Sequence, residues 1–380
     1  MIKSHDLVFS SRPSSAATDI LFYGCKDVGF APYGEYWRQA RKVCVLELLS
    51  LKRVQSFQFV RDEEVEQLVS SLLNFNGASL NISAILTAIV NNIISRCVIG
   101  QKFEAEDGNT WFGEISKNMM VQLTAFSVGD FFPSLVKRDD HDHCHKEDFV
   151  DILLKHQQDG MLDFELTEDN IKAILMGMFV GGSDTSSTAL EWAFEELMKS
   201  PVAMKKAQEE VRRVVGIKSK VEESDMNQMK YLKCVLKETL RLHPSLPLLI
   251  PRETLSSVKF GGYDIPQKTR VFVNSWAIQR DPEIWERPEE FLPERFENSQ
   301  VDFKGQDFEF IPFGSGRRGC PGMSFGIASV EYVMAILLYW FDWELPKTSK
   351  AKDNLDKSEV YGLTVHMKVP LCHLPKLYSF

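Results

Sequence analysis

Apolar residues recur along most of this chain at the three- and four-residue spacing of amphipathic helices. The helices that this spacing predicts cover Arg61–Leu73, Ile82–Gly100, Glu168–Ser200, Val202–Val215, Met229–Leu242 and Phe325–Trp340. The longest of them has Thr167 in front of it as an N-cap and Pro201 directly behind it. Helix is therefore expected to dominate the fold.

Strand patterns are short and lie in the second half of the chain. Alternating runs predict strands over Val258–Ile265 and Arg270–Ser275. Turns are expected at Gly261-Gly262 and Pro266-Gln267. Neither a repeat of fixed period nor a long linker rich in proline, glycine or serine divides the sequence. The expected fold class is mainly α with a small β-sheet, in one domain over residues 1–380.

Composition excludes several classes of function. The chain has 53 acidic and 44 basic side chains and a net charge of -9, the wrong sign for a protein that binds nucleic-acid phosphates. Its 7 cysteines are irregularly spaced, which favours a reducing compartment over a secreted disulfide framework. No stretch of the sequence approaches about 18 apolar residues, so we expect the chain to have no membrane anchor of its own.

One segment, Val136 to Asp148, combines many charges with three histidines. His141, His143, Cys144 and His145 are of the residue types that bind transition metals. Runs of this kind flanked by acids are more often solvated loops, so the segment is interpreted as an exposed loop and not as a metal site.

A glycine-dense loop, FGSGRRGCPG at Phe313 to Gly322, carries Cys320 just before a predicted helix. Glycines allow the backbone to approach a flat cofactor closely. A thiolate in front of a helix is stabilised by amide donors and by the positive end of the helix dipole. Cys320 is therefore a candidate metal ligand. The alternative is a small buried cysteine in a glycine turn.

Two further spacings place a pair of side chains on one helical face, an acid with a cation in one case and an aromatic ring with a cation in the other. Glu238 and Arg241 are three residues apart, and Trp37 and Arg41 are four apart. Taken alone, such pairs are typical of solvated helix surfaces. Here the sequence PRE around Arg252 and the sequence PERF around Arg295 follow the first pair in order.

The middle of the longest predicted helix reads GGSDTSS, from Gly181 to Ser187. Each glycine inside a helix costs about 1 kcal/mol relative to alanine, so another interaction has to offset it. Serine, aspartate and threonine can compete for backbone hydrogen bonds, which predicts a thin, locally loosened helix with room beside it for a ligand. The alternative is a kink that serves helix packing alone.

Together these segments resemble cytochrome P450 enzymes, and among them the plant A-type group. The loop matches the pattern F-x-x-G-x-R-x-C-x-G in each fixed position, and the E-x-x-R, P-R-E and P-E-R-F segments follow the order of that family. The resemblance implies an incomplete P450 fold that binds haem b, with Cys320 as the axial ligand of the iron.

The resemblance also implies roles for other residues. Residues expected to bind the haem are Trp37, Arg41, Arg252, Phe313, Arg318 and Gly322. Glu238, Arg241 and Arg295 would form a structural triad that holds the loop around Cys320. Asp184 and Thr185 would be the acid and alcohol that relay protons to dioxygen. Walls of the substrate pocket are expected from Met178, Phe179, Leu248, Leu249, Leu363 and Thr364.

Two departures from the family pattern are expected. The chain begins just before the second helix of the family, so the anchor, the first helix and two strands would be missing. Between Phe131–Leu135 and Asp148–Asp151, family members carry a long helical stretch over the substrate pocket, and only the short charged segment stands here. A partial lid would weaken water exclusion and substrate retention.

The function implied is that of a haem-thiolate monooxygenase acting on a hydrophobic small molecule, such as a terpenoid or a phenolic. Electrons would come from NADPH through NADPH-cytochrome P450 reductase, with dioxygen as co-substrate, at the cytosolic face of the endoplasmic reticulum membrane. One alternative is rearrangement of hydroperoxides without a reductase, but such relatives generally lack the helix threonine that Thr185 supplies. The other is a truncated, non-catalytic product that binds haem or substrate poorly.

Overall fold

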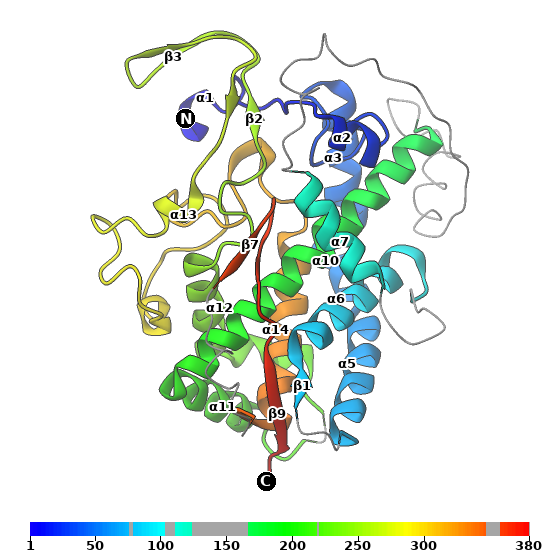
Figure 1. Ribbon diagram of the computed structural model, residues 1–380, viewed down its shortest axis with the longest axis vertical. Coiled ribbons are helices and arrows are strands. Elements are labelled where there is room, and N and C mark those ends of the chain that lie inside the picture. Colours follow the sequence, from blue (N-terminus) through cyan, green and yellow to red (C-terminus); the bar gives the residue numbers. More distant parts are fainter. Residues whose placement is uncertain (76–78, 103–110, 124–165, 219, 347–357, 380) are drawn as a thin grey trace.

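The long helix α10, Glu168–Lys199, runs through the centre of the fold (Figure 1). It contacts α6, Ile82–Ile99, along most of its length, and α14, Met323–Trp340, on another side. The computed structural model describes residues 1–75, 79–102, 111–123, 166–218, 220–346 and 358–379. The segment Val136 to Asp148, with its three histidines and Cys144, lies outside the described residues.

The start of α10 confirms the predicted cap. Thr167 is the N-cap, and its side chain and that of Asn170 form a reciprocal capping box in which each accepts from the backbone of the other. Glu168 and Asp169 in the first turn add negative charge where the helix dipole favours it. At the other end, Pro201 is the first residue of the next helix, because proline has no N–H to continue α10.

The bounds of the other helices are α1 Ile2–His5, α2 Ala16–Leu21, α3 Glu35–Val43, α4 Leu51–Ser56, α5 Gln58–Leu73, α7 Trp111–Gln122, α11 Pro201–Val215, α12 Lys230–Leu242 and α13 Ser275–Ile278. Among these helices, α5, α11 and α12 agree with predicted ones to within three residues, and the rest have no predicted counterpart. Short π or 3₁₀ turns cover Cys44–Leu48, Glu223–Gln228, Pro293–Phe296 and Gly316–Arg318. The described part of the chain is mainly helical, as expected.

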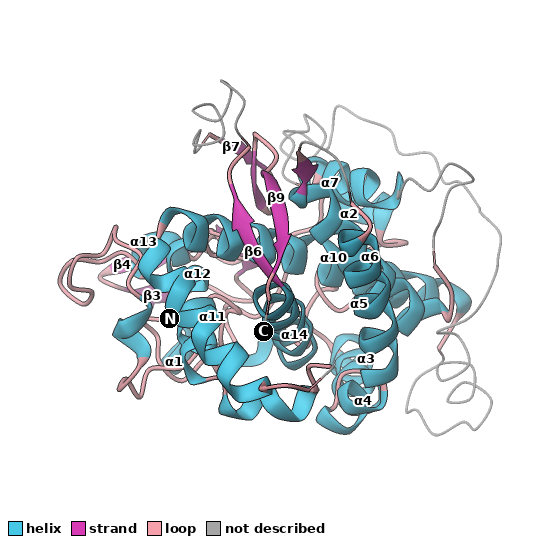
Figure 2. Cartoon of the chain, turned by 90° about the horizontal axis from the view of Figure 1, so that it is seen from below, coloured by secondary structure: helices cyan, strands magenta, loops and turns pink. Residues whose placement is uncertain are grey.

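Strands are short and antiparallel. Their bounds are β1 Leu80–Asn81, β2 Arg252–Glu253, β3 Val258–Phe260, β4 Tyr263–Ile265, β5 Arg270–Val271, β6 Phe341–Glu344, β7 Glu359–Tyr361, β8 Val365–Met367 and β9 Cys372–Leu377. In the largest sheet β9 lies between β1 and β6, and Figure 2 shows β6 and β9 side by side. The remaining strands pair two by two. The sheet content is small, as predicted.

One of the two predicted strand segments is confirmed, and the other forms a shorter strand than predicted. Val258 to Ile265 forms the hairpin of β3 and β4, with its turn at Gly261 and Gly262, which have φ values of 59° and 85°. The strand expected over Arg270–Ser275 is shorter, since β5 ends at Val271. The side chain of Asn274 accepts from the amide of Ala277 and caps α13, which converts the end of the predicted strand into a helix start.

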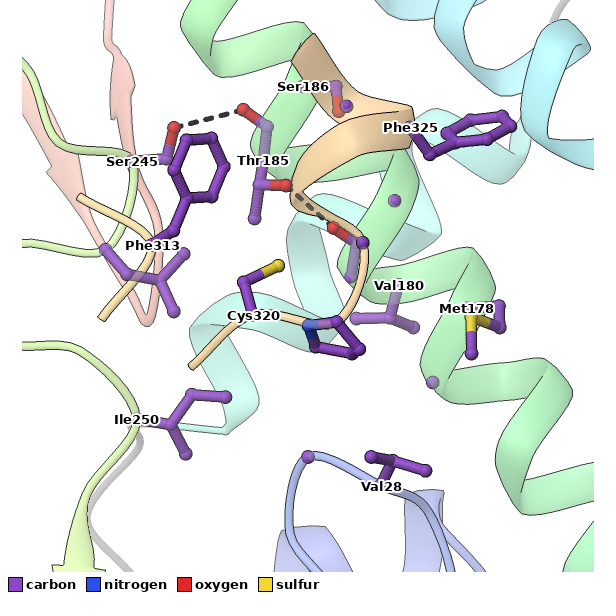
Figure 3. Close-up of a pocket in the computed structure, with 18 of the residues that line it drawn as sticks. Val28, Met178, Val180, Thr185, Ser186, Ser245, Ile250, Phe313, Cys320 and Phe325 are labelled. Atoms are coloured by element: carbon purple, nitrogen blue, oxygen red, sulfur yellow. Dashed lines mark hydrogen bonds between the residues drawn. The ribbon is translucent and has the colours of Figure 1, made fainter. Parts of the chain in front are cut away.

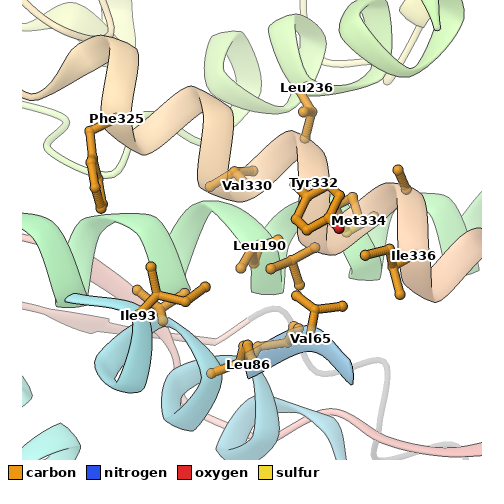
Figure 4. Close-up of a cluster of buried hydrophobic side chains, with 14 of the residues drawn as sticks. Val65, Leu86, Ile93, Leu190, Leu236, Phe325, Val330, Tyr332, Met334 and Ile336 are labelled. Atoms are coloured by element: carbon orange, nitrogen blue, oxygen red, sulfur yellow. The ribbon is translucent and has the colours of Figure 1, made fainter. Parts of the chain in front are cut away.

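The largest group of buried side chains joins α14 to the helices around it. Figure 4 shows Phe325, Val330, Tyr332, Met334 and Ile336 of α14 packed with Leu190 of α10 and with side chains of α5 and α6. Most of these residues belong to a single apolar cluster, which accounts for the near-continuous apolar sequence of α14.

Helices α6 and α14 correct the expectation that no part of the chain could span a membrane. Among the described residues, both are long and apolar enough to cross one. However, 67% of α6 and 61% of α14 are buried inside the fold. The core helices of a soluble protein have the same composition, so these helices are weak evidence for a membrane span.

A partly buried acid on α14 should make stability depend on pH. Burial raises the pKa of the Glu331 carboxyl to about 7, and the charge of Lys233 opposes this shift. The folded chain thus retains a proton that the unfolded chain releases near pH 4.5. The free energy of unfolding should therefore fall between pH 4.5 and 7 by at most about 3 kcal/mol.

Urea unfolding at a series of pH values checks this prediction. Glu331→Gln should remove this part of the pH dependence, because the amide does not titrate. Glu283→Gln is the control, since Glu283 is exposed. A Glu331→Gln variant that loses stability with rising pH as steeply as the unmodified chain would contradict the assignment.

Candidate active site

The loop before α14 presents Cys320 to the interior. The amide of Cys320 donates to the carbonyl oxygen of Phe313 over 2.9 Å and closes the loop, and α14 begins three residues after Cys320, at Met323. Gly314 and Gly316 have φ values of 67° and 71°, in the region that favours glycine. These two glycines explain why the loop can turn tightly enough to bring the sulfur in front of the helix.

Cys320 lines a large cavity next to α10 (Figure 3). The cavity has a volume of about 280 Å³. Its walls are mainly apolar and include Ile94, Val98, Met178, Val180, Ile250 and Phe325. The exposed surface of Cys320 is therefore surface that faces this cavity.

Burial raises the pKa of the Cys320 thiol. The backbone amides of Gly322 and Met323 and the charge of Arg41 all act in the opposite direction. These groups stabilise negative charge on the sulfur, as the position before a helix predicts. A cation bound at the sulfur would complete this stabilisation, since metal binding requires the thiolate.

Arginines gather on one side of the cavity. Arg12, Arg41, Arg252 and Arg318 all line it. Burial, together with the charges of its arginine neighbours, lowers the pKa of Arg12 well below its usual value and that of Arg318 to about 9. The buried acid among them is Asp27, whose pKa burial raises to about 7. The cluster thus holds more positive than negative charge.

This cluster fits the propionates of a haem. Two carboxylates placed among four guanidinium groups would balance charges that repel one another, and guanidinium groups bind carboxylates with directional hydrogen bonds. The sulfur of Cys320 lines the same cavity, and apolar side chains supply the rest of the walls. The donor set, the charge and the apolar walls therefore all suit iron protoporphyrin IX.

Backbone carbonyls hold the arginines in place. Arg318 donates to Ser10 over 2.6 Å and to Ala31 over 2.7 Å, and Arg41 donates to Gly319 over 2.6 Å. Arg252 donates to the carbonyl of Ser315 over 2.9 Å. These contacts tie the N-terminal residues to the cysteine loop, so the positive cluster forms only when distant parts of the chain meet.

Trp37, expected at a propionate, lies behind the arginines. Its indole donates to the carbonyl oxygen of Val28 over 3.0 Å, and the guanidinium of Arg318 lies 4.0 Å from the centre of its ring. Trp37 is buried and is not among the residues that line the cavity. In the described structure it therefore supports Arg318 instead of facing the ligand space.

Arg12 was missed by the sequence interpretation. It donates to the carbonyl oxygens of Gly29, Ile250 and Pro251, over 2.9, 2.6 and 2.8 Å. No local motif surrounds this arginine, and two of its partners lie more than 200 positions away along the chain. Only the neighbouring Pro13 marks the position in the sequence, and proline alone does not point to a binding role.

The residues of the expected triad lie together. Glu238 accepts from Nε and Nη2 of Arg241 at 2.8 Å each, and Nε of Arg295 lies 3.3 Å from the same carboxylate. Glu238 and Arg241 are fully buried. Arg241 also donates to backbone carbonyls of Gln279, Pro288 and Glu290, so this network fixes the segment after α13 against α12.

Gln279, a second residue that the sequence did not indicate, links this network to the cysteine loop. Its amide nitrogen donates to the carbonyls of Leu240 and Arg241 over 3.0 and 3.1 Å. Its side-chain oxygen accepts from the amide of Ile311, two residues before Phe313, over 3.0 Å. The buried glutamine therefore connects the end of α12 to the start of the loop that carries Cys320.

The GGSDTSS stretch forms part of a continuous helix, so the expected local loosening is not observed. The hydroxyl of Thr185 donates to the carbonyl of Gly181 over 2.7 Å, and that of Thr188 donates to Asp184 over 2.8 Å. Gly181, Gly182 and Thr185 line the cavity. Asp184 is adjacent in sequence but turns away from the cavity, since successive helix residues point about 100° apart.

The two glycines serve different purposes. A Cβ on Gly182 would lie 2.8 Å from Cδ1 of Ile94 on α6, whereas a Cβ on Gly181 would meet nothing within 4 Å. Gly182 thus permits close packing of α6 and α10, as in the packing alternative, but without a kink and in a residue that also lines the cavity. Gly181 keeps the cavity wide beside Thr185.

Alanine at each position should separate these roles. Gly181→Ala is expected to raise the free energy of unfolding by about 1 kcal/mol, because alanine favours helix. Gly182→Ala gains the same propensity but displaces Ile94, so it should be about 1–3 kcal/mol less stable than Gly181→Ala. Urea unfolding measures both. Adding Ile94→Val, which removes Cδ1, should recover Gly182→Ala, and equal stability of the two alanine variants would contradict the packing role.

The residues expected as pocket walls divide into two groups. Met178, Leu249 and Leu363 line the cavity. Phe179 belongs to the apolar core, Leu248 has 46% of its surface exposed, and Thr364 is buried against Asp184. Each residue of the second group is next in sequence to one that lines the cavity. For these three residues the prediction identified the right region but the wrong side chain.

Comparisons with known proteins agree with this site. A sequence model of the family described as cytochrome P450 matches residues 2–147 and 136–371. Phenylacetaldehyde oxime monooxygenase CYP71AN24 of Prunus mume is 56% identical over 415 aligned positions, which cover 100% of this chain and 79% of that protein. Cytochrome P450 71A1 of Persea americana is 50% identical, with 98% and 81% covered.

Solved structures extend the similarity to the fold. A zebrafish cytochrome P450 determined with abiraterone has a TM-score of 0.82 and 26% sequence identity. The superposition covers 100% of this chain and 90% of that one. A second zebrafish structure, with progesterone, gives the same TM-score at 25% identity.

The alignments also bear on the expected internal shortening. The first one extends over 415 positions although this chain has 380 residues, so the relative has residues without a counterpart here. The two ranges matched by the family model meet at residues 136–147, where the sequence predicts the missing segment. The alignment length does not locate these residues, and the place of the shortening stays a prediction.

Proposed function

This chain belongs to the cytochrome P450 family of monooxygenases, in its plant A-type group, and we propose that it binds haem b through Cys320 and oxidises a hydrophobic small molecule. One oxygen atom of dioxygen would enter a plant secondary metabolite, such as a terpenoid or a phenolic. The observation that carries the proposal is the cavity that combines the Cys320 sulfur, the four arginines and apolar walls.

The names of relatives support the substrate class. They include a phenylacetaldehyde oxime monooxygenase of Prunus mume and a costunolide synthase of Cichorium intybus, the second 41% identical to this chain. The apolar side chains around the cavity favour a ligand with little charge outside the arginine cluster. We infer a small, mainly apolar substrate.

Different residues would bind the haem, exclude water and leave space for the substrate. When bound, haem would supply the activation of dioxygen, and the thiolate of Cys320 would donate electron density to it. Arg12, Arg41, Arg252 and Arg318 would hold its propionates, and the apolar walls would exclude water around the substrate. Gly181 leaves space on the α10 side, where the backbone can approach closely.

Thr185 and Asp184 would handle protons. The hydroxyl of Thr185 faces the cavity and donates to the carbonyl of Gly181, so its oxygen is available to accept a hydrogen bond from a molecule in the cavity. The carboxylate of Asp184 is buried one residue away, and its Oδ1 has no partner among the described residues. Asp184 would be the acid from which the alcohol is supplied with protons.

Electrons would come from NADPH through NADPH-cytochrome P450 reductase, at the cytosolic face of the endoplasmic reticulum membrane. Both the reductase and the location are proposed from membership of the plant A-type group. Thr185 in the cavity argues against rearrangement of hydroperoxides, the reaction that needs neither reductase nor dioxygen.

A non-catalytic product is the second candidate. The alignment positions without a counterpart in this chain favour it, because loss of part of the lid would let water into the cavity and substrate out of it. The residues proposed to hold haem, Cys320 and the four arginines, all lie outside that segment.

One spectrum tests the proposal. The chain is expressed with a haem precursor, reduced, and treated with carbon monoxide. A thiolate-type Soret band supports haem binding through sulfur, and oxidation of a hydrophobic substrate that requires NADPH and reductase supports the monooxygenase. Haem uptake without such a band would refute the ligand assignment, and a chain that takes up no haem would be the non-catalytic product.

A further inference from the structure

A buried histidine, His366 of β8, lies against α10 on the side away from the cavity. Its Nε2 is 3.1 Å from Oδ2 of Asp184 and 2.8 Å from the hydroxyl oxygen of Thr364. Its Nδ1 is 2.9 Å from the hydroxyl oxygen of Thr188. The histidine thus contacts polar groups with both ring nitrogens, and two of these groups belong to α10.

The spacing of the α10 residues explains how one histidine meets them. Asp184, Thr188 and Glu191 are separated by four and three residues, so they share one face of the helix. β8 contacts this face of α10. The charge of His366 lowers the pKa of Glu191, although burial raises it overall, so two buried acids face the imidazole.

Hydrogen-bond counting assigns the proton on Nε2. Thr364 donates its single hydroxyl proton to Oδ2 of Asp184. The contact between that hydroxyl oxygen and Nε2 then requires a proton on the nitrogen. The carboxylate oxygen Oδ2 therefore accepts from Thr364, and the protonated Nε2 lies 3.1 Å from it.

The second ring nitrogen is consistent with a charged ring. Thr188 donates its hydroxyl proton to the carbonyl oxygen of Asp184 over 2.8 Å. A hydrogen bond from Nδ1 to the same hydroxyl oxygen would then need a proton on Nδ1 as well. With or without a proton on Nδ1, the ring donates from Nε2 to the hydroxyl oxygen of Thr364 and lies 3.1 Å from Oδ2 of Asp184.

We propose that His366 is a positioning residue that holds the hydroxyl of Thr364 against Oδ2 of Asp184 and leaves Oδ1 as the free acceptor of this acid. Holding Oδ2 restricts rotation of the carboxylate, so the position of Oδ1 is restricted as well. The role in proton supply rests on the proposed function. The contacts of Nε2 with Thr364 and Asp184 do not.

Nuclear magnetic resonance of the ring nitrogens tests whether Nε2 of His366 carries a proton and lies beside Asp184. The full chain is labelled with ¹⁵N-histidine, and the His366 signals are identified by their loss in His366→Gln. At pH 7, Nε2 should carry a proton, and Asp184→Asn should shift its resonance. A ring with Nε2 unprotonated, or one that does not respond to Asp184→Asn, would overturn the proposal, whether or not haem is bound.

Coupling of electron input to product formation tests the role. In the holoenzyme, His366→Phe and Asp184→Asn should each lower the product formed per NADPH by about tenfold or more, in line with loss of a proton-transfer group. The double variant should lose no more than either single one. His366→Gln, whose amide can donate to the hydroxyl oxygen of Thr364, should retain most of the coupling.

His243 provides the matched control. It is partly buried, stacks on Trp192 and pairs with Glu196 of α10 over 3.0 Å, and no contact joins it to Asp184 in the described structure. His243→Phe should lower the melting temperature without lowering coupling. Equal loss of coupling in both phenylalanine variants would show that His366 acts through packing and would overturn the proposal. Wild-type protein that lacks the thiolate band would instead refute the proposed function, and the nitrogen spectrum would still decide on His366.

Discussion

Serine in place of Cys320 is expected to abolish both the thiolate-type Soret band and the monooxygenase activity. The sulfur lines the cavity, where the amides of Gly322 and Met323 and the charge of Arg41 stabilise its thiolate. A serine hydroxyl has nearly the same size but does not ionise near neutral pH and is a poor donor for a soft metal site. The electron density that favours cleavage of the oxygen–oxygen bond would be lost with the sulfur. The reduced carbon monoxide difference spectrum measures the result directly.

Cys97 of α6 is the matched control, because it lines the same cavity. Burial raises the pKa of its thiol to about 12, with only partial opposition from the charges of Arg61 and Arg96, so it remains a neutral thiol. Cys97→Ser should keep the band. A band that survives Cys320→Ser and disappears in Cys97→Ser would show that Cys97, and not Cys320, binds the iron, and would refute the proposed site.

The parts of the fold that the sequence predicts are those with local causes. The cap at Thr167 and the helix start after Pro201 depend on residues within one or two turns, and both were predicted at the right position. α14 follows from the apolar periodicity after the cysteine loop. The triad could be predicted because a known motif order linked Glu238 and Arg241 to Arg295, 54 residues or more further along.

The parts that the sequence does not predict depend on long-range contacts or on the direction of a single side chain. Arg12 and Gln279 become functional candidates only through partners that the fold brings to them. Thr364 and Phe179 were expected in the pocket, yet each points away from it while its neighbour lines it. A shift of one residue changes the direction by about 100° on a helix and reverses it on a strand, so a regional resemblance cannot fix it.

Loss of the Glu238 carboxylate should have the largest effect on stability. Glu238 and Arg241 are fully buried, and the carboxylate accepts from Arg241, from Arg295 and from the amide of Leu292. Glu238→Ala leaves a buried guanidinium without its counter-charge, which typically costs about 3–5 kcal/mol. That is a large share of the roughly 5–15 kcal/mol by which folded domains are stable, so we expect a much lower melting temperature and little haem in the purified protein. Circular dichroism on heating measures the first, and the Soret absorbance per protein measures the second.

A surface pair with the same spacing distinguishes burial from charge pairing as such. Glu35 and Arg38 on α3 are also three residues apart, but both are more than half exposed. Glu35→Gln should leave the melting temperature unchanged, because solvent screens the pair. If Glu35→Gln and Glu238→Ala had equal effects, the triad would be no more than a helix-surface ion pair. If Glu238→Ala lowered haem content while the melting temperature stayed unchanged, the carboxylate would act on the ligand site directly, and the link through Gln279 to the cysteine loop would have to carry that effect.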